Sequence, residues 1–124
     1  MSKYKNIRAT IIVRVNGLIL LVVARNGLTL LPGGRVNRGE LPISAAAREL
    51  YEETGLKATS LSYLFEYESF SNLHHVFFVE ACGKAVAAGD AVRLEYLSGS
   101  VNAVHVNMSP ATRAIIAKFY SFHC

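Results

Sequence analysis

The sequence predicts a single α+β domain built on a mixed β-sheet. Most of the chain consists of short segments rich in β-branched and other apolar residues, which is typical of strands. Two further segments carry apolar residues at helical spacing, and they do not alternate regularly with the strands. No repeat, low-complexity tract or Pro/Ser-rich linker divides the 124 residues, so one domain is expected over 1–124.

The first third of the chain predicts three strands. Ile7 to Val15 is β-branched and partly alternating, and the Asn16-Gly17 pair that follows is a strong hairpin signal. Leu18 to Ala24 is continuously apolar, which suits a central strand buried on both faces. Leu28 to Leu31 predicts a short strand that the Pro32-Gly33-Gly34 loop must end.

A helix is predicted over Pro42 to Thr54, where the hydrophobic period changes to that of a helix. Pro42 suits the first helical turn, and Gly55 stands where a left-handed residue would end the helix. Further elements follow it: strands over Ser60–Ser69, His74–Cys82 and Val92–Leu97, and a closing helix over Pro110–Tyr120 capped by Ser109.

Composition excludes several classes of protein. Hydrophobic residues make up 52% and charged residues 18%, which excludes intrinsic disorder. The longest apolar run, Leu18 to Ala24, is too short to cross a membrane. The basic start, Met1 to Arg8, is followed by no signal-peptide core, and Cys82 and Cys124 form no disulfide or metal pattern. We therefore expect a cytoplasmic protein.

The charge distribution is unusual for a basic protein. Thirteen Lys and Arg against nine Asp and Glu give a net charge of +4, which favours a polyanionic partner such as nucleic acid or phosphate. Yet four of the nine acidic residues, Glu40, Glu49, Glu52 and Glu53, lie within one short stretch. At helical spacing, the last three place their carboxylates on neighbouring turns of one face, where like charges repel.

Two interpretations of this acidic helix compete. A solvated charged surface is the ordinary explanation of such a cluster. However, one arginine, Arg48, cannot neutralise three carboxylates, whereas Mg²⁺ prefers oxygen ligands of this kind. The preceding loop carries Gly33 and Gly34, where backbone can approach a ligand, and Arg35 and Arg38, which can hold phosphate oxygens. This context favours a metal–pyrophosphate site.

The segment from Gly34 to Leu56 resembles the signature of the Nudix hydrolase family at every specified position. That signature is G-x5-E-x7-R-E-U-x-E-E-x-G-U, where U is a bulky aliphatic residue. The Leu-Pro-Gly-Gly lead-in, the order of strands and the closing MSPATRAIIAKF segment are similar to MutT-type members. The resemblance implies the Nudix fold, a mixed sheet sandwiched between helices (α/β/α), and hydrolysis of a nucleoside diphosphate linked to a group X.

The resemblance also implies roles for individual residues. The ligands that it implies for Mg²⁺, with Mn²⁺ as a substitute, are Glu49, Glu52, Glu53 and the backbone carbonyl of Gly33. Glu40 is implied as a secondary ligand, with a bridging water as one way for it to reach the metal. Arg48 is implied as the residue that orients the glutamates. Gly34, Gly55, Leu50 and Leu56 are implied to shape the loop and dock the helix.

In this family a carboxylate accepts a proton from the water that attacks phosphorus. Glu49 and Glu53 are the candidates for that base, with Glu49 favoured because it begins the triplet beside Arg48. MutT-type enzymes also supply a carboxylate from a late loop. By its position before an aromatic residue, Glu95 is the first choice for that ligand and Asp90 the second, while an ordinary exposed strand residue is the alternative for Glu95.

Substrate preference is only partly indicated. Thr112 falls where the enzyme specific for oxidised guanine carries a base-reading asparagine, and Val23 stands where its purine-binding arginine is expected. Both differences disfavour 8-oxo-dGTP, so we expect a nucleotide substrate of unassigned base. The alternatives are an RNA 5′-pyrophosphohydrolase and a domain that binds nucleotide or RNA without turnover. Scattered basic residues make stable nucleic-acid binding the weaker hypothesis.

Two expectations concern the surroundings of the site. His74 and His75 alternate faces on a predicted strand, so one is expected at the core edge and one at the surface, rather than both on a metal. A mean hydropathy of +0.29 in so small a domain favours a homodimer that covers apolar surface.

Overall fold

The computed structural model describes residues 5–98 and 107–123. Its elements are β1 (Asn6–Val15), β2 (Leu18–Ala24), β3 (Thr29–Leu30), β4 (Gly33–Arg35), α1 (Pro42–Thr54), β5 (Lys57–Glu68), β6 (Asn72–Cys82), β7 (Ala91–Leu97) and α2 (Pro110–His123). Both predicted helices are present, and the predicted strands are present with shifted ends. The α+β prediction is confirmed.

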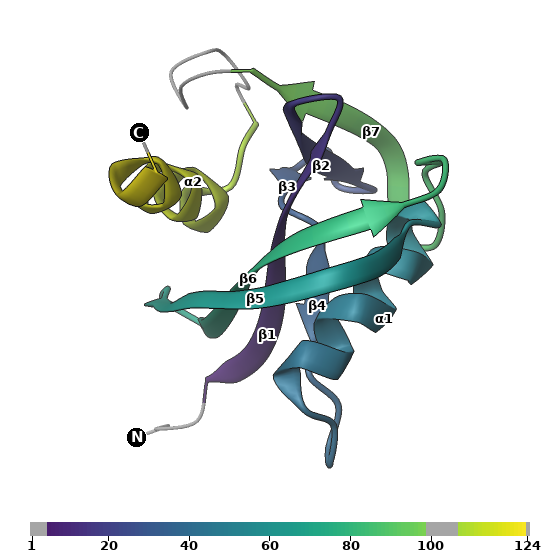
Figure 1. Cartoon of the computed structure of the whole chain (residues 1–124). Helices are drawn as coiled ribbons and strands as arrows, with labels where there is room; N and C mark the ends of the chain where they lie inside the picture. The colour runs from purple at the N-terminus through teal and green to yellow at the C-terminus, as the bar shows by residue number, and fades with distance from the viewer. Residues whose placement is uncertain (1–4, 99–106, 124) are drawn as a thin grey trace.

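The sheet is mixed, with β1 at its centre (Figure 1). The strand order is β3-β2-β1-β6-β5, and β4 and β7 pair with β1 and β2. β1 runs parallel to β6, whereas the other pairs are antiparallel. Asn16 and Gly17 both have positive φ angles, 53° and 80°, in the tight hairpin that joins β1 to β2.

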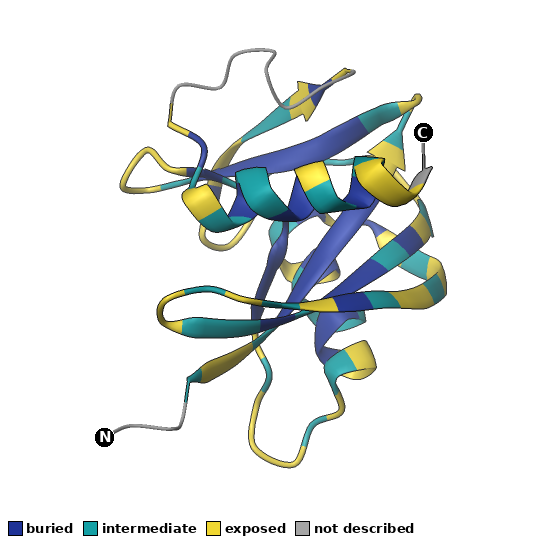
Figure 2. Cartoon of the chain, turned by 90° about the vertical axis from the view of Figure 1, so that its left-hand side faces the viewer, coloured by how far each residue is buried: buried dark blue, intermediate teal, exposed yellow. Residues whose placement is uncertain are grey.

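Each face of the sheet is covered by one helix (Figures 1 and 2). Alternate residues of β1 divide between the two cores: Ile11 packs with Leu50 of α1, and Ile12 packs with Ile115 of α2. All four side chains are fully buried. The sheet is therefore sandwiched between helices, as the Nudix resemblance implies.

The ends of α1 match their sequence signals. Pro42 occupies the first helical turn, and Gly55 ends the helix in the left-handed conformation at φ 74°. The Gly55 N–H donates to the carbonyl of Tyr51 at 2.9 Å, which satisfies one of the last orphan carbonyls. The predicted cap of α2 is also present, because Ser109 Oγ accepts the N–H of Thr112 at 3.1 Å.

The segment after Pro32 differs from the predicted loop. Gly33 to Arg35 forms strand β4, which pairs with Arg8, Ala9 and Thr10 of β1. Gly33 has φ 150°, and any side chain there would overlap the carbonyl oxygen of Ala9. Two glycines thus let this backbone lie against β1, where it completes a ladder instead of turning away. Hydrophobic periodicity did not predict this strand, because three residues are too few to show a period.

Neither helix in the described part of the chain is long and apolar enough to cross a membrane.

Candidate active site

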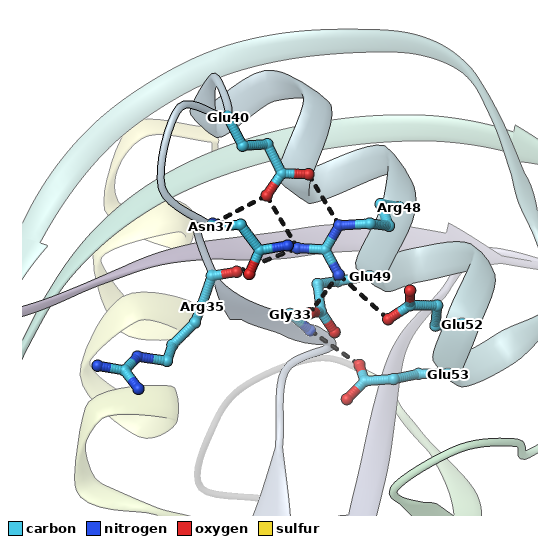
Figure 3. A network of polar contacts seen from close by, with 8 residues as sticks. All are labelled: Gly33, Arg35, Asn37, Glu40, Arg48, Glu49, Glu52 and Glu53. Atoms are coloured by element: carbon cyan, nitrogen blue, oxygen red, sulfur yellow. Dashed lines mark hydrogen bonds and ion pairs between the residues drawn. The ribbon is translucent and has the colours of Figure 1, made fainter.

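Arg48 is the centre of the acidic helix face (Figure 3). Its Nε and Nη2 donate to the two carboxylate oxygens of Glu40 at 2.8 and 2.9 Å. Its Nη1 donates to Glu49 at 2.9 Å and to Glu52 at 3.2 Å, and Nη2 also reaches the carbonyl of Arg35 at 3.1 Å. One guanidinium therefore ties α1 to the loop before it. Arg48 and Glu52 form an i,i+4 ion pair on the helix surface.

Glu40 supports this network from the loop. Besides binding Arg48, it accepts the backbone N–H of Asn37 at 2.9 Å, which closes the turn that leads into α1. The hydrogen bonds from Arg48 and then from Asn37 lower the pKa of Glu40 to about 2, so it is charged at any ordinary pH. Glu40 does not line the cavity described below.

Glu53 lies in a different environment from Glu40. Its Oε1 accepts the N–H of Gly33 at 3.0 Å, so the end of α1 is joined to β4. Burial raises the pKa of Glu53 to about 7, and the neighbouring charges of Glu49 and Asp90 add to the rise. The Gly33 N–H and the charge of Arg8 act in the opposite direction. The surroundings of the Glu53 carboxyl group therefore offer too little positive charge to offset the effect of its burial.

Glu49 and Glu53 line one cavity of about 280 Å³, which we call the carboxylate cavity. Asp90 contributes a third acidic side chain to its wall. The remaining lining residues are Arg8, Val22, Ala24, Leu30, Gly33, Gly34 and Arg35. Acidic groups thus come from α1 and the loop before β7, and the two arginines come from paired positions on β1 and β4.

The loop between β6 and β7 explains how Asp90 reaches this cavity. The N–H groups of Val86 and Ala88 donate to the carbonyls of Thr54 and Glu53, each at 2.9 Å. These carbonyls belong to the last turn of α1, where they have no helical partner. The loop docks on the end of the helix for this reason and holds Asp90 beside Glu53.

Glu95, the first choice from the sequence for the late carboxylate, lies elsewhere. It stands within β7, opposite Leu21 of β2, and its carboxylate accepts a hydrogen bond from Arg93 at 3.2 Å. It does not line the carboxylate cavity, whereas Asp90 does. Sequence position alone did not favour Asp90, because the docking depends on backbone groups that have no residue-type signal.

The family resemblance implies a divalent cation at this cavity. Among the described residues, no three Asp, Glu, His or Cys side chains stand in an arrangement that would hold an ion. The physical reason is that Arg48 binds Glu49 and Glu52 and the Gly33 N–H binds Glu53. The acidic side chains of the cavity offer oxygen atoms, which are the ligands that Mg²⁺ prefers, and no cationic group binds the partly buried Glu53 among the described residues. The chemical type of these ligands therefore fits a hard divalent cation, whereas their present arrangement among the described residues does not form a cation site.

A second cavity, of about 380 Å³, lies on the α2 side of the sheet, and we call it the hydroxyl cavity. Thr10, Ser69 and Thr112 contribute hydroxyl groups to its wall. The remaining lining residues are Arg8, Leu30, Leu31, Phe70, Ser71, Asn72, His74, Ser109, Pro110 and Ala111. No acidic side chain is among these described residues.

His74 and Thr10 form a buried polar pair within the hydroxyl cavity. The Thr10 hydroxyl lies 2.8 Å from His74 Nδ1, and Ser69 Oγ lies 3.4 Å from His74 Nε2. Burial, with a smaller effect of Arg8, lowers the pKa of His74 to about 4, so the ring is neutral near pH 7. One of the two histidines was expected at the core edge and the other at the surface; His74 is the buried one, and His75 is partly exposed.

Thr112 reaches the hydroxyl cavity because α2 starts beside β3. Thr29 pairs with Met108, and the N–H of Ser109 donates to the Thr29 carbonyl at 3.1 Å. The buried Thr112 hydroxyl then accepts the N–H of Leu31 at 3.1 Å. The candidate base-reading position therefore contacts the Leu-Pro-Gly-Gly segment itself.

The remaining candidates separate in space. Arg35 lines the carboxylate cavity and donates to Asn6 Oδ1 at 2.5 Å, whereas Arg38 is exposed on the loop and lines neither cavity. Glu52 is half-exposed and also outside both linings. Arg8, which no sequence signal marked, lines both cavities. The signal in the sequence that could have marked Arg8 is its spacing, which places this arginine on the same face of the strand as Thr10 and Ile12.

Comparison with known proteins places the chain in a family. The NUDIX domain model matches residues 5–104, so the chain belongs to the Nudix family. A candidate Nudix hydrolase from Chromobacterium violaceum has a similar structure, with a TM-score of 0.89 and 31% identity over 99% of this chain and 81% of that one. The α/β/α fold and the recognition of the Nudix signature are both confirmed.

Relatives with described activities match shorter stretches. An RNA pyrophosphohydrolase of Bartonella clarridgeiae is 61% identical over 31 residues, which cover 25% of this chain and 18% of that protein. A candidate 8-oxo-dGTP diphosphatase of Bacillus subtilis (strain 168) is 40% identical over 75 residues, which cover 56% of this chain and 50% of that protein. The matched stretches span half or less of these curated relatives.

A more distant structure shares the fold. The bifunctional NMN adenylyltransferase/ADP ribose pyrophosphatase of Francisella tularensis, determined with AMP and a manganese ion, has a TM-score of 0.77 and 23% identity. The similarity covers 98% of this chain and 43% of that one.

Proposed function

We propose that the protein is a Mg²⁺-dependent hydrolase that cleaves the pyrophosphate linkage of a nucleoside diphosphate joined to a group X. The observation that carries the proposal is the carboxylate cavity, in which Glu49, Glu53 and Asp90 face Arg8 and Arg35. Carboxylates hold a hard cation, and guanidinium groups hold phosphate oxygens. Family membership and the names of the matched relatives support this chemistry.

In this proposal, Glu49, Glu53 and the Gly33 backbone bind the cation, with Asp90 as the late carboxylate and Glu52 at the rim. When bound, Mg²⁺ or Mn²⁺ polarises the phosphate oxygens and neutralises charge that develops at phosphorus. Arg48 orients Glu49 and Glu52 through the hydrogen bonds described above. The carboxylates would thereby hold the diphosphate at the cavity through the cation.

We assign the proton-accepting role to Glu53 rather than Glu49. Glu49 already accepts a hydrogen bond from Arg48 at 2.9 Å, and that contact holds its carboxylate in place. Glu53 accepts a hydrogen bond only through Oε1, from the Gly33 N–H, among the residues that the structure describes, so its second oxygen is available to accept a proton. Glu53 then accepts a proton from the water that attacks phosphorus.

The hydroxyl cavity is the proposed place for the organic part of the nucleotide. Its volume, about 380 Å³, suits a small-molecule site, and its wall offers hydroxyls, the Asn72 amide and the neutral His74 ring. Thr112 belongs to this wall, as its sequence position implies. The Val23 side chain is buried within β2, so no cation from that position reaches the cavity.

The experiment is a turnover screen with Mg²⁺ and then Mn²⁺. Nucleoside triphosphates, ADP-ribose, dinucleoside polyphosphates and NADH are offered, and release of phosphate, pyrophosphate or a nucleoside monophosphate is measured. Glu53→Gln is expected to lower turnover by about 10²–10⁴-fold. Glu80→Gln, which makes the same change at an exposed position of β6, is the control. Absence of turnover of every substrate would refute the proposal.

A second candidate function is removal of pyrophosphate from RNA 5′ ends, which the match to RNA pyrophosphohydrolases favours. A short 5′-triphosphorylated RNA in the same screen tests it. Turnover of that RNA in preference to free nucleotides would establish this variant. Salt-dependent RNA binding without release of phosphate would instead identify a binding domain.

A further inference from the structure

Arg8 has an unusual position for an arginine in a central strand. It is partly buried in β1, opposite Arg35 of β4 and beside His74 of β6. Two like charges directly across an antiparallel ladder are destabilising. Arg35 offsets part of that cost by donating to Asn6, whereas the Arg8 side chain makes no hydrogen bond or ion pair with any residue that the structure describes.

Most other cations of the described chain have a partner. Carboxylates bind Lys5, Arg48 and Arg93, and aromatic rings lie beneath Arg14 and Lys118. The cations without such a contact, such as Arg25 and Lys57, are exposed to water, which solvates them. Arg8 is only partly in water, and its guanidinium donors are open to a ligand because no described residue accepts them.

The location of Arg8 identifies what those donors face. It lines both the carboxylate cavity and the hydroxyl cavity, so it stands where the two meet. Its charge acts in both directions, because it lowers the pKa of Glu53 on one side and of His74 on the other. A ligand with one end in each cavity would therefore come within reach of this guanidinium.

We propose that Arg8 binds a phosphate group of the substrate at the junction of the two cavities. This inference rests on the proposed function and states how the substrate lies across the two cavities. The diphosphate lies toward Glu49 and Glu53, the organic group lies toward Thr112, and an anionic oxygen between them accepts hydrogen bonds from Arg8. The phosphate also offsets the repulsion between Arg8 and Arg35, since it presents negative charge to both.

The test measures binding of inorganic pyrophosphate in the presence of Mg²⁺ by titration calorimetry. Arg8→Gln is expected to weaken binding by about 10- to 100-fold, because a charge-assisted hydrogen bond is lost. Arg8→Lys keeps the charge without the planar fork and is expected to show an intermediate loss. Lys57→Gln removes one exposed charge far along the chain and is expected to change binding less than twofold. Thermal unfolding of each variant shows that the fold persists.

Turnover separates this inference from the function on which it rests. With a substrate from the screen, Arg8→Gln is expected to raise KM more than it lowers kcat, because the contact exists before the chemical step. Pyrophosphate binding that is absent, or unchanged in Arg8→Gln, would overturn the role of Arg8 even if the wild type turns over nucleotides. Arg8-dependent binding without any turnover would support the anion site and refute the hydrolase.

Discussion

The α-carbon of Gly34 lies so close to the carboxylate of Glu49 that a methyl group at position 34 would overlap it. β4 therefore contributes no side chain at this point, and the Glu49 carboxylate of α1 packs directly against its backbone. The carboxylate that meets Gly34 is also bound by Arg48 at 2.9 Å. Position 34 thus controls where the Glu49 carboxylate lies.

Gly34→Ala is expected to displace the Glu49 carboxylate while leaving the fold intact. The overlapping atoms belong to the end of a flexible side chain, which can move. A displacement of this kind in a catalytic site lowers turnover on the order of 10²-fold. Turnover and thermal unfolding are measured together, and full activity in Gly34→Ala would contradict the assigned place of Glu49.

Gly33→Ala provides the contrast, because the same methyl group meets backbone there. It would overlap the carbonyl oxygen of Ala9, and Gly33 has φ 150°, which L residues rarely adopt. We expect loss of more than about 2 kcal/mol of folding stability, since neither strand can yield. An unfolding temperature equal to that of the wild type would show that β4 does not pair as described.

The late carboxylate is tested by comparing Asp90→Asn with Glu95→Gln. Asp90 lines the carboxylate cavity and raises the pKa of Glu53, whereas Glu95 is paired with Arg93 in β7. We expect Asp90→Asn to raise the Mg²⁺ concentration needed for half-maximal turnover by about tenfold, the usual effect of losing an ordered ligand group. A larger effect of Glu95→Gln would restore the choice made from sequence position.

Glu53 is expected to make the metal-free protein less stable as pH rises. Its pKa is raised from 4.5 to about 7 in the folded state, so the folded protein holds a proton that the unfolded chain releases. The stabilisation is fully present below pH 4.5 and is lost as pH rises through 7, amounting to about 3 kcal/mol. Denaturant unfolding from pH 5 to 8 measures this slope.

Two controls isolate the contribution of Glu53. Glu53→Gln has no carboxyl to titrate, so its stability is expected to lack this fall with pH. Saturating Mg²⁺ is expected to reduce the slope of the wild type, because a cation stabilises the charged carboxylate. A slope that persists in Glu53→Gln would assign the effect to another group.

His74 is expected to change the stability of the protein with pH in the opposite direction from Glu53. Its pKa is lowered from 6.5 to about 4 by burial and by Arg8, so the unfolded chain binds a proton first. This contribution to stability is complete above pH 6.5 and is lost as pH falls through 4. An NMR titration of the imidazole measures it directly, and Arg8→Gln is expected to raise the pKa. Titration near 6.5 in the folded wild type would contradict the buried Thr10 contact.

The acidic helix was predictable because its information is local. Helical spacing alone places Glu49, Glu52 and Glu53 on one face and brings Arg48 within reach of Glu52. The caps at Pro42 and Gly55 follow from backbone preferences of single residues. The strand at Gly33 was missed for the converse reason, since its pairing depends on contact with β1 rather than on its own side chains.

The choice among the carboxylates depended on long-range packing. Docking of the 83–90 loop on the carbonyls of Glu53 and Thr54 brings Asp90 to the cavity, and this docking uses only backbone groups. The different surroundings of Glu49 and Glu53, one paired with Arg48 and the other buried against Gly33, arise from β4. Helix geometry treats these two residues alike.

The sequence by itself determined the fold class, the helix that carries the glutamates and the family chemistry, because period, capping and fixed spacing are local properties of the chain. Only the tertiary structure decided which acidic residues share a cavity and that Arg8 stands between two cavities. Those relations depend on strand register and loop docking, which bring residues distant in sequence together. The physical reason is that burial and pairing set the charge state of a side chain, and both are properties of the folded surroundings.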